Sequence, residues 1–178
     1  MQPMANIALR AARKAADFIL LSFDRPDQLR IEEKTSKDFV SNIDKRAEEI
    51  IVEQIQTTYP THNILAEESG TTQVDKSNEY TWIVDPIDGT LNFIRGIPHF
   101  AVSIGIQKGR HLEHGVIVDP INREEYVASR GYGATLNGKK IRVSSSESLQ
   151  DGLVSAGIAP SNINQRLESY IKNLQEFT

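Results

Sequence analysis

Cysteine is absent from the 178 residues of the chain, which excludes disulfide bonds, thiolate zinc sites and cysteine nucleophiles. No apolar run approaches the roughly 20 residues that a membrane-spanning helix needs, and the N-terminus lacks the apolar segment of a secretory signal. The net charge of −4 is too small to favour direct binding to nucleic acid. We therefore expect a globular, cytoplasmic protein that acts neither in a membrane nor directly on nucleic acid.

Acidic side chains are concentrated in one stretch of the chain. Residues 61–100 contain 6 acidic and 2 basic residues, so this stretch alone accounts for the net charge of −4. Carboxylates that converge repel one another unless a cation joins them. The cluster therefore indicates a cation site built from oxygen ligands.

The hydrophobic pattern changes from helical spacing to strand spacing near residue 60. Pro26 and Pro60 follow two amphipathic segments that we predict as helices, and Asn137-Gly138 is typical of a tight hairpin. The predicted order is helices at 4–22 and 41–58, strands at 29–33, 63–67, 80–85, 100–107, 111–119, 124–129 and 133–143 (the last a hairpin pair), a strand at 153–158, and a helix capped by Ser161. This order predicts an α+β layered fold in which two N-terminal helices cover a mostly antiparallel sheet.

The final strand and helix of this prediction can bury little apolar surface by themselves. We expect residues 1–150 to form an N-terminal α+β half that holds the metal site. Residues 151–178 are expected to begin a truncated C-terminal α/β half, which a longer chain or a partner subunit would cover.

The segment with the clearest chemistry is 82–93, with the sequence WIVDPIDGTLNF. An apolar strand delivers Asp85 at its carboxyl end, and Pro86, which has no N–H, is expected to turn the chain. Asp88 follows three residues after Asp85, so both carboxylates can face one point, and the carbonyl of Ile87 can join them. Such hard oxygen ligands favour magnesium. Asp-Pro and Asp-Gly are also ordinary turn dipeptides, so the motif alone leaves a plain loop open.

The next two residues of the motif favour a bound anion. Gly89 allows the backbone to come close to a ligand. Thr90 is predicted to begin a short helical turn, whose free N–H groups suit a phosphate.

Two acidic positions upstream have both a functional and a structural interpretation. Glu67 and Glu68 end a predicted strand, and since neighbouring strand residues face opposite sides, only one should point into a site. A solvated acidic loop is the alternative. Asp44 stands three residues after Ser41, as in a helix capping box, and that structural role alone would explain Asp44.

Three segments, taken in order and spacing, resemble the inositol monophosphatase family. They are residues 34–44 (KTSKDFVSNID), 66–69 (AEES) and 85–93 (DPIDGTLNF). Residues 7–15 and 97–104 are similar to the same family, and its bacterial extragenic-suppressor type matches best. The resemblance covers the whole chain and implies the layered αβαβα sandwich of that family.

The resemblance implies a magnesium-dependent hydrolase of phosphate monoesters. By its pattern, Glu67, Asp85 and the carbonyl oxygen of Ile87 would hold one magnesium ion. Asp85 would also bridge to a second ion, which it shares with Asp88. Two cations of this kind neutralise the ester and activate a water molecule.

The resemblance also implies roles for residues around the metals. Asp44 and Thr90 would orient the attacking water, and Glu67 would help to activate it. The backbone N–H groups of Gly89 and Thr90 would hold the phosphate, and Lys34 would lie on an accessory loop near the metals. The substrate-binding set implied in this way is Glu67, Ile87, Asp88, Gly89 and Thr90.

One departure from the family pattern limits these expectations. Members carry a later Trp-Asp-x-Ala-Ala-Gly motif whose aspartate binds the second metal, and no such motif occurs here. We therefore expect these 178 residues alone to bind magnesium weakly and to hydrolyse poorly.

The expected substrate is myo-inositol monophosphate, and other small sugar or nucleotide phosphates stay open. The resemblance further implies a homodimer. An alternative function, implied by the bacterial type, is that of a regulatory binding partner in transcription antitermination and ribosomal RNA synthesis.

Overall fold

The structure is a computed structural model that describes most of the chain. The described residues are 2–35, 38–72, 74–75, 77–148, 152, 155 and 167–172, with the backbone alone at 33–35 and 38–40. Apart from residue 155, the predicted strand at 153–158 lies outside the described residues, as does the predicted cap Ser161. Residues 167–172 are helical, which agrees with the predicted last helix.

The chain divides into two compact units, which are described separately. One unit consists of residues 1–32 and 39–142, and the other consists of residues 33–38 and 143–178. The first unit contains the sheet and the helices that follow. The expected domain boundary at residue 150 stays a prediction.

The order of elements follows the sequence pattern closely. The helices of the first unit are α1 (Pro3–Phe23), α2 (Asn42–Thr58) and α3 (Thr90–Ile94), with a short 3-10 turn at Pro26–Gln28. The strands are β1 (Ile31–Thr35), β2 (Asp38–Ser41), β3 (Asn63–Ala66), β4 (Gly70–Thr72), β5 (Tyr80–Asp88), β6 (Ala101–Lys108), β7 (His111–Asp119), β8 (Glu124–Ser129), β9 (Gly133–Leu136) and β10 (Lys139–Ile141). The strand predicted at 29–33 begins two residues later because the Leu29 N–H closes the 3-10 turn onto Pro26.

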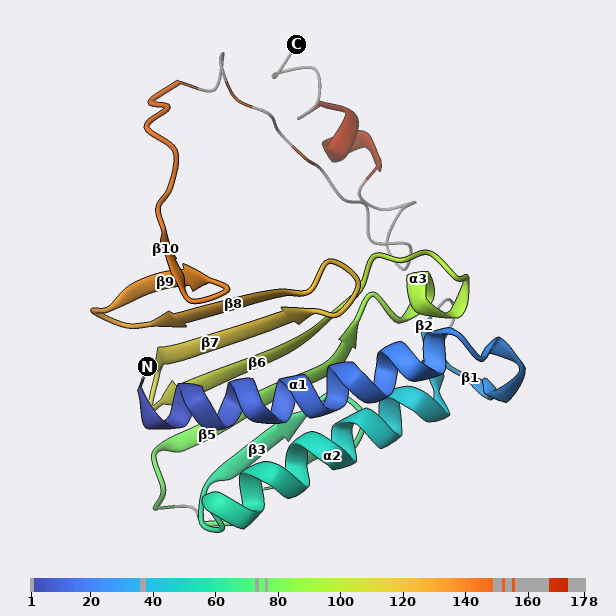
Figure 1. The fold of residues 1–178 in the computed structure, drawn as a ribbon, viewed down its shortest axis with the longest axis horizontal. Coiled ribbons are helices and arrows are strands. Elements are labelled where there is room, and N and C mark those ends of the chain that lie inside the picture. The colour runs from blue at the N-terminus through green and yellow to red at the C-terminus, as the bar shows by residue number, and fades with distance from the viewer. Residues whose placement is uncertain are drawn as a thin grey trace. The chain divides into compact units, whose positions relative to one another are not determined.

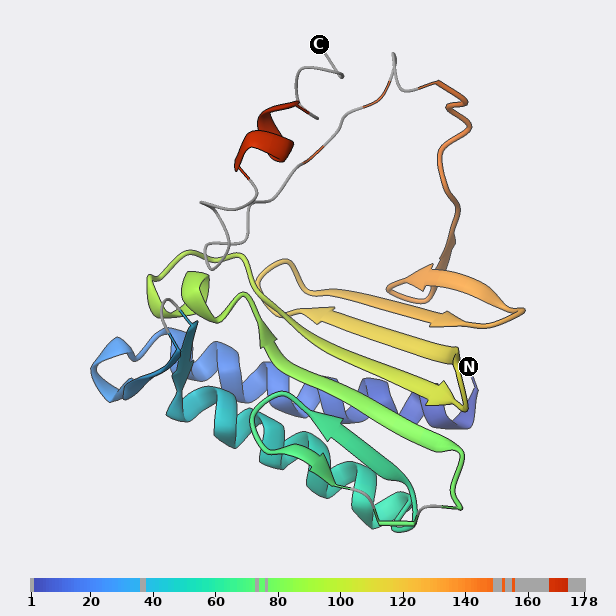
Figure 2. The ribbon, with the colours of Figure 1, turned by 180° about the vertical axis from the view of Figure 1, so that it is seen from behind.

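Eight of these strands form one sheet, in the order β10-β9-β8-β7-β6-β5-β3-β4 (Figures 1 and 2). Successive strands from β5 to β10 pair antiparallel, which confirms the predicted mostly antiparallel sheet. The exception is β3, which pairs parallel with β5. This parallel pair brings two carboxyl ends to one edge of the sheet.

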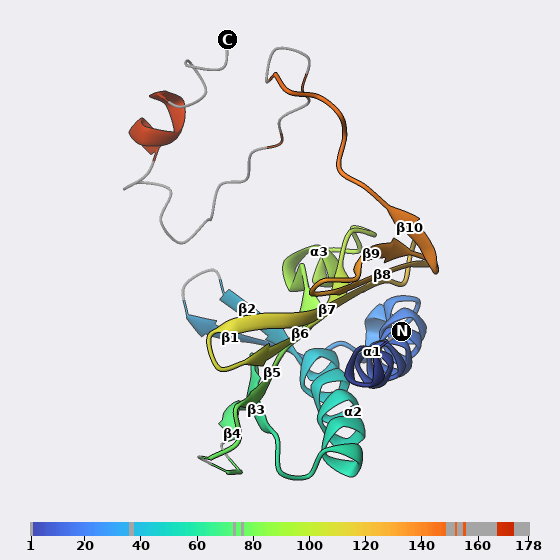
Figure 3. The ribbon, with the colours of Figure 1, turned by 90° about the vertical axis from the view of Figure 1, so that its left-hand side faces the viewer.

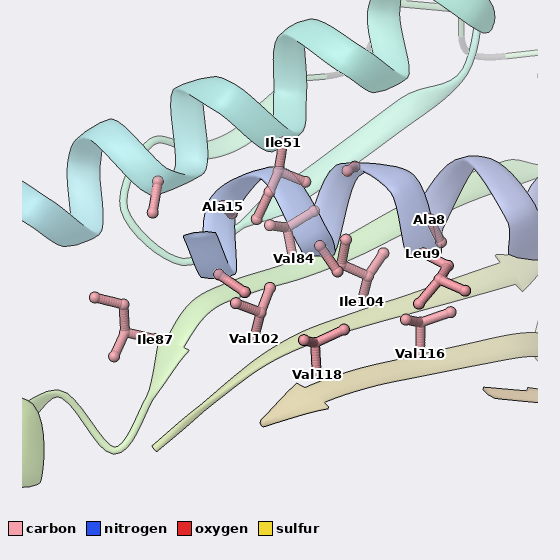
Figure 4. Packing of buried hydrophobic residues seen from close by; sticks show 14 of the residues in the cluster. Ala8, Leu9, Ala15, Ile51, Val84, Ile87, Val102, Ile104, Val116 and Val118 are labelled. Atoms are coloured by element: carbon pink, nitrogen blue, oxygen red, sulfur yellow. The ribbon is translucent and has the colours of Figure 1, made fainter. Parts of the chain in front are cut away.

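Helices α1 and α2 cover one face of this sheet, as the prediction required (Figure 3). Helix α1 packs on β6, β7 and β8, and α2 packs on β5 and on α1. Figure 4 shows the interface, in which α1 and α2 contribute Ala8, Leu9, Ala15 and Ile51 and the strands contribute Val84, Val102, Ile104, Val116 and Val118. The small, buried alanines of α1 allow this helix to pack closely on the strands.

The course of β5 differs from the prediction at Pro86. Pro86 was expected to turn the chain, but β5 continues through Asp88. The register with β6 shifts between Asp85 and Asp88, so the strand absorbs the proline in an irregularity rather than ending there. Such bulges bend the strand locally and re-aim its side chains.

Candidate metal centre

Glu67 and Asp85 are neighbours because of the parallel pairing of β3 and β5. The last paired residues are Ala66 and Val84, and each acid follows directly on one of them. The backbone N–H of Glu67 donates to the carbonyl of Val84 at 3.1 Å. The carboxylate of Glu67 lies close enough to that of Asp85 to raise the pKa of the Asp85 carboxyl. The structure therefore brings these two predicted metal ligands together.

Asp85 carries the clearest electrostatic signal of the site. Its Oδ1 is buried and has no hydrogen-bond partner among the described residues. Burial, followed by the nearby carboxylates of Glu67 and Asp88, raises the pKa of the Asp85 carboxyl to about 8. A buried carboxylate oxygen among like charges is costly unless a proton or a cation joins it.

The carbonyl of Ile87, near the end of β5, faces the hydroxyl of Thr90 at the start of α3. Thr90 Oγ1 lies 2.9 Å from the Ile87 carbonyl oxygen and 2.9 Å from Oδ1 of Asp44. A hydroxyl has one proton, and the charged carboxylate is the stronger acceptor. When Thr90 donates to Asp44, the Ile87 carbonyl keeps its lone pairs for another partner, as a ligand oxygen requires.

Asp44 has both of the roles that the sequence left open. Its Oδ2 accepts from the backbone N–H and the hydroxyl of Ser41, which completes the predicted capping box at the start of α2. Its Oδ1 accepts from Thr90, and the residue is only 1% exposed. Asp44 thus joins the N-terminus of α2 to the loop that follows Asp85.

Gly89 is required by the local fold as well as by any ligand. Its φ is 99°, and it lies directly before α3. A β-carbon at this position would lie 2.9 Å from the carbonyl oxygen of His99 and 3.3 Å from the α-carbon of Phe100. The residues just before β6 therefore pack against the Gly89 backbone and fix the start of α3.

Not every predicted site residue is brought together. Asp88 is exposed, and it acts on Asp85 only through its charge. The side chain of Lys34 lies outside what the structure describes. Within the described residues, three or more acidic or histidine side chains do not converge in a cluster that could hold a metal ion.

Three of the predicted ligands fit magnesium in their donor chemistry. Glu67 and Asp85 supply carboxylate oxygens, Ile87 supplies a neutral carbonyl oxygen, and the buried Oδ1 of Asp85 lacks a partner within the described part of the chain. Magnesium prefers such oxygen ligands and keeps several waters of its own. The donor set is thus suited to magnesium, although the arrangement is not a complete cage.

Sequence reasoning missed one residue of the site, Glu48. It is 3% exposed on α2, and its carboxylate accepts from the backbone N–H groups of Glu68 at 2.7 Å and Ser69 at 2.9 Å. The available signal was its spacing: Glu48 lies four residues after Asp44, on the same face as the buried Ile51.

Comparisons with known proteins agree with this geometry. Residues 1–178 match the sequence profile described as the inositol monophosphatase family. The chain is 47% identical over 174 residues to the Nus factor SuhB of Pseudomonas aeruginosa, covering 96% of this chain and 64% of that protein. The chain thus spans about two thirds of the length of this relative.

Solved structures give the same assignment. The extragenic suppressor protein SuhB of Bartonella henselae superposes with a TM-score of 0.92 at 34% identity, covering 99% of this chain and 67% of that one. The inositol monophosphatase of Anabaena (Nostoc) has a TM-score of 0.69 at 34% identity, over 83% of this chain and 52% of that one. Among the residues that the structure describes, none of the helices has both the length and the apolar character of a membrane span. The sequence motifs, the layered fold and these matches establish that the chain belongs to the inositol monophosphatase family.

Proposed function

We propose that this chain carries the magnesium-binding half of a phosphatase for small phosphate monoesters, with myo-inositol monophosphate as the substrate. The observation that carries the proposal is the buried Oδ1 of Asp85, which lacks a partner among the described residues and lies beside the carboxylate of Glu67. The chain spans 64% of the length of its Pseudomonas aeruginosa relative, so the phosphatase activity of the whole protein is itself part of this proposal.

Four residues would hold magnesium, at two sites. Glu67, Asp85 and the Ile87 carbonyl would form one site, and Asp88 would join Asp85 at a second. When bound, magnesium lowers the pKa of a coordinated water, neutralises the phosphate and stabilises the leaving oxygen. The proximity of Glu67 to Asp85 through parallel strand pairing supports this set.

The remaining residues would position water and phosphate. Thr90 donates its proton to Asp44, so its oxygen is left to accept a hydrogen bond from an attacking water. Glu67 would help to take the proton of that water. The N–H groups of Gly89 and Thr90, at the start of α3, would bind the phosphate oxygens. The accessory role expected for Lys34, whose backbone lies in β1 rather than on a loop, stays a prediction.

The proposal is tested by metal binding and by product release. Manganese, a paramagnetic substitute for magnesium, should bind the wild-type chain, and Asp85→Asn should weaken that binding by at least tenfold. Glu53→Gln, an exposed change on α2, is the control and should bind as the wild type does. The preferred substrate is then identified by comparing phosphate release from inositol 1-phosphate, fructose bisphosphate and 3′-phosphoadenosine phosphate by the full-length protein. If the wild type and Asp85→Asn bind manganese equally, the proposed site is wrong.

A second function is favoured by one observation. The relative with 47% identity is named a Nus factor, so a binding role in the transcription machinery, as part of antitermination, is the alternative that we propose. Pull-down of transcription proteins with the wild type and with Asp85→Asn would separate the two. Retained partner binding by a variant that no longer binds metal supports an independent binding role. Both roles suit a cytoplasmic protein, and a homodimer stays a prediction.

A further inference from the structure

Glu48 is a buried charge on the apolar face of α2. It is 3% exposed, and its neighbours on that face include Ala47 and Ile51, both 0% exposed. A buried carboxylate is strongly unfavourable unless hydrogen bonds replace its water. Here Oε2 accepts from the N–H of Glu68 at 2.7 Å and Oε1 accepts from the N–H of Ser69 at 2.9 Å.

These two hydrogen bonds help to fix the turn formed by residues 67–69. The N–H of Glu67 already donates to the carbonyl of Val84 on β5. The next two N–H groups along the chain, those of Glu68 and Ser69, both donate to Glu48. Three successive amides are therefore held from two directions, which sets the direction of the Glu67 side chain toward Asp85.

A turn at this place does not by itself need a buried carboxylate. Glu67 and Ser69 are both exposed, so water could serve the amides of a loop with no other duty. The chain instead places an ionisable group in its core at a cost in desolvation. A requirement for a fixed turn explains that cost.

We propose that Glu48 is a positioning residue for the metal site: by binding the amides of Glu68 and Ser69 it holds the Glu67 carboxylate in the orientation that a cation needs. This inference rests on the proposed magnesium site. Groups that orient metal ligands in this way affect metal affinity by about 10–100-fold when they are changed.

The test measures manganese affinity in Glu48→Gln. The glutamine oxygen can accept from one amide, but its NH2 group faces the other N–H, so one bond of the pair is lost. We expect manganese to bind about 10–100-fold more weakly than to the wild type. Ile51→Val is the matched control. It removes one buried methyl from the same face of α2 and lowers the stability modestly, but it leaves both hydrogen bonds to Glu68 and Ser69 in place.

A second variant, Glu48→Asp, keeps the inference testable if Glu48→Gln does not fold. Glu48→Asp keeps the charge and both oxygens but shortens the side chain by one methylene, so it cannot reach both amides without moving the turn. It should also weaken manganese binding, while thermal unfolding confirms that it is folded.

Each outcome either supports or overturns the positioning role of Glu48. Weakened binding in the Glu48 variants with normal binding in Ile51→Val supports positioning. Wild-type affinity in Glu48→Gln overturns it and leaves the proposed metal site intact. Equal weakening in Ile51→Val means that lost stability is the cause, which also overturns it. A wild type that binds no better than Asp85→Asn overturns the proposed function and this inference together.

Discussion

Asp44 and Glu48 lie one helical turn apart on the buried face of α2, and their carboxylates hold two different loops. Asp44 accepts from the hydroxyl of Thr90, where the loop after β5 enters α3. Glu48 accepts from the amides of Glu68 and Ser69, in the loop after β3. Since β3 and β5 are parallel neighbours, both loops lie at one edge of the sheet. One helix face thus sets the distance between the two groups of candidate ligands.

Thr90→Val should destabilise the protein by leaving Asp44 without one of its donors. Valine matches threonine in shape but has no hydroxyl, so Oδ1 of Asp44 loses its 2.9 Å bond in a site that is 1% exposed. Leaving a buried acceptor unsatisfied costs about 1–3 kcal/mol. Urea denaturation measures the change in the free energy of unfolding.

Thr57→Val is the control for this substitution. Its hydroxyl donates to the carbonyl of Glu53 on the exposed side of α2, so we expect a change within about 0.5 kcal/mol. Equal stability in Thr90→Val and the wild type would show that the bond to Asp44 contributes nothing.

Gly89→Ala should disturb the site through the backbone. The residue has a φ of 99°, and an added β-carbon would lie 2.9 Å from the carbonyl oxygen of His99. The unfavourable φ costs about 1–3 kcal/mol, and the contact adds to that cost because a backbone atom cannot move aside easily. We expect a lower midpoint of thermal unfolding and weaker manganese binding.

Gly131→Ala separates the effect of the positive φ from the effect of the contact with His99. Gly131 also has a positive φ, of 77°, but a β-carbon there would have nothing within 4 Å. It should lose stability through φ alone and keep its manganese affinity. A loss in Gly131→Ala as large as that in Gly89→Ala would mean that the contact with His99 has no effect.

The residues of the site were easier to predict than their arrangement. The family resemblance around Asp85 supplied candidate ligands, which stay predictions, and alternation of apolar residues predicted most strands. The parallel pairing of β3 with β5 was not predicted, because the pattern of one strand does not show which strand it joins. Pro86 was expected to end the strand, but pairing with β6 outweighed this local preference.

Glu48 shows a second limit of the sequence. A glutamate in an amphipathic helix is usually assigned to the solvated face. Its spacing after Asp44 places it on the buried face, but the two amides that bind its carboxylate lie about twenty residues further along the chain, and no local pattern identifies them. Asp44 was ambiguous for a different reason, since each of its two oxygens has a separate role.

The stability of the metal-free protein should fall as pH rises toward 8. Burial, followed by the charges of Glu67 and Asp88, raises the pKa of Asp85 to about 8, whereas an unfolded aspartate titrates near 3.9. Between these values the folded state holds a proton that the unfolded state has released, so each step up in pH favours unfolding. The effect of this group is complete once the pH exceeds the folded pKa.

Thermal unfolding in EDTA from pH 5 to pH 8 measures this effect as a difference between variants. Asp85→Asn has no proton to lose, so the gap between its midpoint and that of the wild type should shift in favour of the variant as pH rises. Glu53→Gln, on the exposed side of α2, should follow the wild type at every pH. A constant gap between the wild type and Asp85→Asn across this range would show that Asp85 is ionised throughout, and that its oxygens have a partner in the metal-free protein.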